Sequence, residues 1–128
     1  MNKLVKTVSS SNMYQEFLHV LNGILSLTDR ELELFTMLVS LDINYEKDPE
    51  KGKNIVNTAN RRLIMNELGI TRDNLCRYIS KFKSLGYIVK GKVDGEWIIN
   101  RALIPIIIND RVQITIILKV KDEWKSYN

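Results

Sequence analysis

The stretch from residue 61 to residue 100 constrains the fold more than any other part of the chain. Gly69 follows an apolar-periodic segment where a helix commonly ends in a left-handed residue, and Thr71 then offers an N-cap for another helix. That helix stops at Gly86, and Asp94-Gly95 is a strong turn signal between two short strands. The pattern predicts, in order, a short helix, a tight turn, a second helix and a two-stranded hairpin.

Two further helices are expected before this stretch. Polar residues 9–12 offer several helix caps, and apolar side chains then recur at helical spacing. These apolar side chains are Met13, Phe17, Val20, Leu21 and Ile24. The next helix begins with a capping box, in which Thr28 is the N-cap and Glu31 is the third helical residue. It is expected to run to about Leu41.

The two helices around Gly69 each have a predicted inward face. The first runs from about Thr58 or Ala59 to Leu68, and its inward residues are Leu63, Ile64 and Leu68. The second covers Arg72 to Leu85. Its apolar side gathers Leu75, Tyr78, Ile79, Phe82 and Leu85.

The C-terminal part is expected to form an extra β-hairpin. Residues 106–108 are isoleucines that lead to a turn at Asn109-Asp110. One face of the following strand would carry Val112, Ile114, Ile116, Leu118 and Val120. Two interpretations stay open: the hairpin either adds a layer to the monomer's own sheet, paired with a short strand at residues 3–8, or contributes to a dimer interface.

Composition sets broad limits on the class of protein. A chain of 128 residues is expected to be one domain, and its net charge of +4 with a pI near 9.2 permits a nucleic-acid partner without requiring one. Residues 46–53 are polar and contain Pro49 and Gly52, so they are interpreted as an exposed loop, with a basic contact at Lys51 and Lys53 as the alternative. We find no apolar run of membrane-spanning length and no signal peptide, so a cytoplasmic protein is expected.

The exposed face of the second helix is the best candidate for a binding surface. Asp73, Arg77, Ser80 and Ser84 form its centre, with Asn74 and Lys81 on one flank and Arg72 and Lys83 on the other. A helix in the DNA major groove needs this division between a packed side and a polar side.

Individual roles follow from side-chain chemistry. Arg77 is expected to contact guanine through two hydrogen bonds, and Asn74 could pair with adenine. Arg72 could contact a base or a phosphate, whereas Lys81 and Lys83 are expected to contact phosphates. The alternative for each residue is a solvated surface, and the carboxylate of Asp73 on the same face counts against DNA.

Basic residues outside this helix extend the candidate surface. Arg61 and Arg62 open the preceding helix, and Lys90 and Lys92 lie on the hairpin, which could follow the minor groove or its phosphates. Trp97 is interpreted as a residue at the base of the hairpin, with base stacking as the alternative.

Catalytic chemistry has little support in the sequence. His19 is the only histidine and Cys76 the only cysteine, so neither a disulfide nor a cysteine-pair metal site can form within one chain. Phosphate-binding glycine loops are missing. We therefore expect a protein that is not an enzyme and needs no cofactor or metal.

The motifs resemble the winged helix-turn-helix superfamily of DNA-binding proteins. Leu68-Gly69-Ile70-Thr71 matches its turn, and residues 79–88 match its recognition helix running into a strand. The segment Gly95–Asn100 is similar to the ending seen in small plasmid and phage replication initiators, although Arg101 stands where those usually continue with proline. The resemblance implies an α+β winged-helix core over residues 28–104, with residues 105–128 as a hairpin extension and tail.

Two functions remain open at this point. The first is sequence-specific binding of double-stranded DNA by a transcriptional regulator or replication initiator of phage, plasmid or bacterial type. Such a protein could act as a homodimer that forms through the N-terminal helix, the C-terminal hairpin or both. The second is a non-enzymatic interaction or assembly module, such as a phage-particle component, that uses a winged helix as a scaffold.

Overall fold

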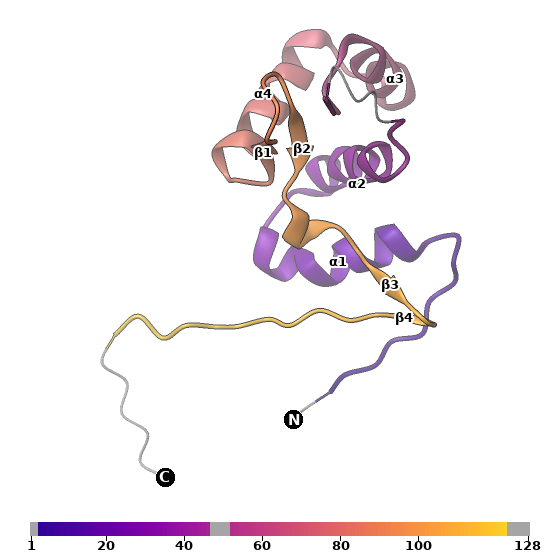
Figure 1. Ribbon diagram of the computed structural model, residues 1–128, viewed down its shortest axis with the longest axis vertical. Coiled ribbons are helices and arrows are strands. Elements are labelled where there is room, and N and C mark those ends of the chain that lie inside the picture. Colours follow the sequence, from indigo (N-terminus) through magenta and orange to yellow (C-terminus); the bar gives the residue numbers. More distant parts are fainter. Residues whose placement is uncertain (1–2, 47–51, 123–128) are drawn as a thin grey trace.

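The computed structural model describes residues 3–46 and 52–122, and within these ranges the chain is an α+β protein. Four helices are followed by two small antiparallel hairpins (Figure 1). The helices are α1 (Met13–Leu25), α2 (Asp29–Ile43), α3 (Thr58–Leu68) and α4 (Arg72–Ser84). The strands are β1 (Ile88–Lys90), β2 (Trp97–Ile99), β3 (Ile107–Ile108) and β4 (Arg111–Val112), with a 3₁₀ turn at Arg101–Leu103. This layout is compatible with the expected winged-helix arrangement.

Local capping explains where the helices begin and end. The predicted capping box of α2 is present: the Thr28 hydroxyl accepts a hydrogen bond from the Glu31 backbone N–H, and the Glu31 carboxylate accepts one from the Thr28 N–H. At α4 the Thr71 hydroxyl caps the helix by accepting a hydrogen bond from the Asn74 N–H. Gly69 ends α3 at a φ of 63°, as predicted.

The core lies where α2 and α4 meet the first hairpin. The ring of Phe35 on α2 packs against Phe82 on α4 at 5.2 Å between centroids, and against Tyr87 at 5.8 Å. Ile88 and Ile99, which are directly opposite each other in the hairpin, are buried in the same cluster. The core therefore fixes α4 and the hairpin relative to each other.

Four residues predicted to face inward are instead exposed. Val20 and Ile24 on α1 are each 54% exposed, and Leu63 on α3 and Leu85 after α4 are 43% and 47% exposed. On α1 the buried stripe is rotated toward Phe17, Leu18, Leu21 and Leu25. The physical reason is that each of these helices packs on one narrow stripe, and the position of its neighbour decides which apolar residues that stripe includes.

The first hairpin is wider at its tip than a two-residue turn. Lys90 pairs with Trp97, so residues 91–96 form the connection. The predicted turn at Asp94-Gly95 lies inside this longer loop, where the Glu96 N–H donates to the Val93 carbonyl and Gly95 has a φ of 81°. The Glu96 carboxylate explains the wider loop, because it folds back to accept hydrogen bonds from the N–H groups of Val93 and Lys53. The segment at Lys53 also borders the hairpin: its carbonyl accepts from the Trp97 N–H, and the Trp97 carbonyl accepts from the Ile55 N–H.

The expected C-terminal strand is present only at its start. β3 and β4 pair through two residues each around a turn at Asn109, where φ is 59°. Residues 113–121, which we call the C-terminal arm, continue as extended chain that passes below α1 in the view and reaches beyond it (Figure 1). Residues 3–8 form no strand and pair with no sheet. Both strand predictions fail because neither segment has a hydrogen-bonding partner within the described residues.

Candidate nucleic-acid interface

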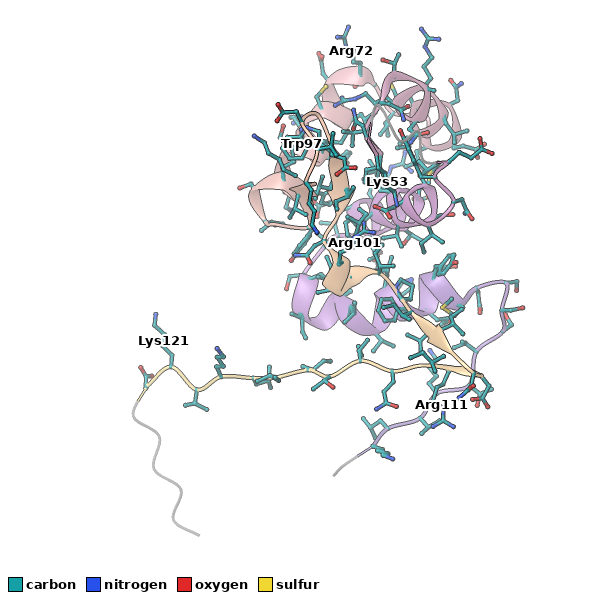
Figure 2. The ribbon with its side chains drawn as sticks, in the orientation of Figure 1. Lys53, Arg72, Trp97, Arg101, Arg111 and Lys121 are labelled. Carbon is teal, nitrogen blue, oxygen red and sulfur yellow. The ribbon has the colours of Figure 1, made fainter. Side chains whose placement is uncertain are left out.

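Helix α4 presents one packed side and one open side. Leu75, Ile79 and Phe82 are buried, whereas Arg77 lies on the exposed side. Arg72 begins the helix at the end of the molecule opposite the C-terminal arm (Figure 2). The division predicted from helical periodicity is therefore present, and Asp73 is exposed on the same helix.

Two lysines from different elements lie over the Trp97 ring, and an arginine from a third element acts on one of them. The Lys83 ammonium on α4 lies 3.8 Å from the centre of the Trp97 ring, and Lys90 on β1 lies 5.8 Å from it. The pKa of Lys83 lies below its ordinary value of 10.5, first because the ammonium is partly buried and then because the positive charges of Arg61 on α3 and of Lys90 act on it. We call Arg61, Lys83 and Lys90 with Trp97 the cation cluster.

The cation cluster concentrates positive charge beside α4. Within the described residues, none of Arg61, Lys83 and Lys90 forms an ion pair. Arg61 is held in place by a hydrogen bond of 2.7 Å from its Nε to the Val56 carbonyl, and its Nη1 lies 3.5 Å from the Cys76 sulfur on α4. Cations that repel one another at close range form a site that an anion would stabilise.

The opposite flank of α4 is occupied by internal contacts. Asn74 accepts a hydrogen bond from the Arg77 guanidinium, so the two predicted base readers contact each other. Lys81 forms an ion pair of 2.5 Å with the buried Glu31 carboxylate on α2. Burial would raise the pKa of Glu31, but hydrogen bonds from Lys81 and Thr28 outweigh it and the pKa is lowered. Lys81 thus serves the α2–α4 contact and its charge is partly compensated.

The other predicted residues lie on the surface around these two flanks. Arg62 on α3 and Lys92 in the hairpin loop are both exposed. Lys53, the alternative basic contact, is instead paired with the buried Asp42 at 2.7 Å, and Lys51 lies outside the described residues. A surface hollow of about 230 Å³ is lined by Glu31, Asn74, Arg77, Tyr78 and Lys81.

The buried carboxylate of Asp42 is the main polar feature that the sequence predictions missed. It accepts hydrogen bonds from Lys53 at 2.7 Å, from Arg101 at 2.5 Å and from the Ile99 N–H at 2.9 Å. These contacts join α2 to the hairpin and to the turn that follows it. Its position on the same helical stripe as Leu38 was an available signal, because a carboxylate on a buried face requires partners.

No family model matches the chain, and no curated protein or solved structure matches it either. In residues 3–46 and 52–122 no group of His, Cys, Asp and Glu side chains could hold a metal ion. No helix within these ranges has the length and apolar character needed to cross a membrane.

Proposed function

We propose that this protein is a winged helix-turn-helix that binds double-stranded DNA, as a transcriptional regulator or replication initiator of phage, plasmid or bacterial type. In this proposal α3 and α4 form the helix-turn-helix and the hairpin β1–β2 is the wing. The order of the elements supports it, as do the glycine and threonine caps between α3 and α4. The protein would act in the cytoplasm, without catalysis and without a cofactor.

The observation that carries the proposal is the cation cluster beside the open face of α4. Arg61, Lys83 and Lys90 come from separate parts of the sequence and meet without a compensating carboxylate in the described residues. A phosphate lying against them would relieve their mutual repulsion. Because the cluster flanks α4, the same phosphates would orient that helix toward the major groove.

In this proposal the exposed arginines of α4 recognise the DNA sequence. Arg77 has its guanidinium positioned by Asn74, which limits its freedom before binding. A guanidinium held in this way can donate two hydrogen bonds to guanine. Arg72 lies five residues earlier, at the start of the helix, and would contact a neighbouring base or phosphate.

Two substitutions separate the roles of the cluster and the helix face. Lys83→Ala should weaken binding to all duplex sequences alike, whereas Arg77→Ala should cost roughly 1–3 kcal/mol at one base position. Fluorescence anisotropy with selected and scrambled duplexes measures both effects. Lys6→Ala is the matched control, because Lys6 is an exposed cation on the N-terminal segment, where it pairs with Glu16 of α1. Equal effects of all three substitutions would contradict the assignment.

The exposed C-terminal arm favours a second candidate function. Its aliphatic side chains are typical of surfaces that add a strand to another protein, so an interaction or assembly module built on the same scaffold is the alternative. Such a module would not need the cation cluster. If the protein binds DNA and loses that binding when the cluster is mutated, protein interaction or assembly cannot be its sole function.

A further inference from the structure

Trp97, labelled in Figure 2, has a backbone that is fixed on both sides of its strand. On one side β2 pairs with β1, where Lys90 stands directly opposite Trp97. On the other side the Trp97 N–H donates to the Lys53 carbonyl, and the Trp97 carbonyl accepts from the Ile55 N–H, both at 3.0 Å. A residue that is bonded on both edges has little local freedom, so its indole ring keeps a fixed place beside α4.

The pairing of Trp97 with Lys90 is of the kind that brings side chains close together. Both backbone groups of Trp97 point to residues 53–55, so this is a non-hydrogen-bonded pair of the antiparallel ladder. The next pair along the hairpin agrees with this register, because the Gly91 N–H donates to the Glu96 carbonyl at 3.1 Å. Side chains approach more closely in a non-hydrogen-bonded pair, and the Lys90 ammonium accordingly lies 5.8 Å from the centre of the Trp97 ring.

Lys83 reaches the same ring from the last turn of α4. Its ammonium lies 3.8 Å from the ring centre, which is a direct contact with the π face. The ring occupies one side of the ammonium, whereas an ammonium has three N–H donors. Neither Lys83 nor Lys90 takes part in an ion pair in the part of the chain that the structure describes, so both can still donate to an anion.

We propose that Trp97 is a positioning residue that orients the ammonium of Lys83, and more weakly that of Lys90, toward a phosphate group. The inference rests on the proposed function, because it assigns a role to Trp97 within the same surface. A cation–π contact attracts a lysine without neutralising it, whereas a carboxylate partner would compensate the charge. The ring therefore orders cations that repel each other and leaves their charge available to phosphate oxygens.

The same geometry argues against base stacking as the role of Trp97. A stacked base needs an open ring face, and the Lys83 ammonium already covers a face of this ring. The lowered pKa of Lys83 agrees with an anion as the ligand, because partial burial and the charges of Arg61 and Lys90 all act against its charged form. A phosphate would relieve this repulsion, whereas a neutral base would not.

Titration of the full chain with inorganic phosphate tests the site without DNA. The ε-methylene resonances of the lysines are followed by NMR. In the unmodified protein the indole ring current should displace the Lys83 resonance upfield, and phosphate should move the Lys83 and Lys90 resonances to saturation. Chloride at the same ionic strength controls for screening, and it should leave both resonances nearly unchanged.

Substitutions at Trp97 separate the π face from simple packing. Trp97→Leu should abolish the ring-current shift of Lys83 and weaken phosphate binding by about fivefold. Trp97→Phe keeps a weaker aromatic face and should weaken binding by only about twofold. Tyr45→Leu is the control, because the Tyr45 ring lies 5.9 Å from Lys53, whose charge Asp42 already compensates, and it should leave phosphate binding unchanged.

A double-mutant cycle shows whether Trp97 acts through Lys83. In a Lys83→Gln background, Trp97→Leu should cause little further loss of phosphate affinity. Far-UV circular dichroism verifies that each variant keeps its helices. If Trp97→Leu does not fold, the ring-current shift of the unmodified protein and the twofold effect of Trp97→Phe still test the inference.

A mixed-sequence duplex then distinguishes the source of the phosphate. If the proposed function holds, the duplex should shift the same Lys83 resonance, and Trp97→Leu should weaken duplex binding by about fivefold for every base sequence. Phosphate binding that requires Trp97, without any binding of duplex DNA, would support this inference and refute the proposed function. Duplex binding that Trp97→Leu leaves unchanged would refute this inference and retain the proposed function.

Three further results would overturn the role of Trp97. The first is a Lys83 resonance without an upfield displacement in the unmodified protein. The second is a phosphate affinity that Trp97→Phe lowers as much as Trp97→Leu does, because packing rather than the π face would then be responsible. The third is a full additional loss on Trp97→Leu in the Lys83→Gln background, which would show that the ring does not act through Lys83.

Discussion

The carboxylate of Asp42 connects more of the molecule than any other single polar group described. It is 1% exposed and bonds to two cations and one backbone N–H from segments more than ten residues away. A buried carboxylate is stable only when its partners replace its hydration. Helical periodicity places Asp42 on the inward side of α2, but the identity of its partners depends on how the chain after α2 returns to it. The sequence therefore predicts that Asp42 needs polar partners, but it does not predict which residues these partners are.

Asp42→Asn should destabilise the fold by about 2–3 kcal/mol, because it leaves Lys53 and Arg101 without their shared anion. The cost is at the low end for a buried pair, since the Arg101 side chain is 53% exposed and can be hydrated. Chemical denaturation monitored by circular dichroism measures it. Asp110→Asn makes the same change in an exposed pair with Arg111 and should leave the stability nearly unchanged. A similar loss in both variants would rule out the buried network as the cause.

At the scale of single elements, local signals predicted the boundaries and tertiary contacts decided the orientation. The caps at Thr28 and Thr71 and the stop at Gly69 depend on a few adjacent residues, and each was predicted. The exposure of Val20 and Leu63 was not predicted, because it depends on which neighbouring element each helix packs against. The strand predicted through Ile116 failed for a related reason: alternation indicates a buried face but does not supply the partner.

Two glycines test the role assigned to the turn between α3 and α4. Gly69 has a φ of 63°, and a Cβ there would meet nothing within 4 Å. Gly69→Ala should therefore destabilise the protein by about 1 kcal/mol through backbone strain alone. Gly23→Ala is the control, because Gly23 lies in α1 with equal space around its Cβ, and it should stabilise by roughly 0.5–1 kcal/mol. Thermal melts compare the two, and a stabilised Gly69→Ala variant would refute the left-handed stop.

At the scale of the whole molecule, the fold produces a charge distribution that the overall net charge does not reveal. Arg61, Lys83 and Lys90 were each predicted as candidates on separate elements, and the packing of α3, α4 and β1 brings them to one place. Lys81 and Lys53 were also candidates, but both are paired with buried carboxylates. Sequence could identify the cations, whereas only the three-dimensional arrangement separates those that are free of ion pairs in the described chain from those that are compensated.

The salt dependence of binding to mixed-sequence duplex DNA tests the central claim most directly. If Arg61, Arg72, Lys83, Lys90 and Lys92 contact phosphates, the logarithm of the affinity should fall with the logarithm of salt with a slope of about −4.5. The double variant Lys83→Ala/Lys90→Ala should bind more weakly and reduce that slope by about 2. Absence of binding at low salt, or an unchanged slope in the double variant, would contradict the assignment of this surface to DNA.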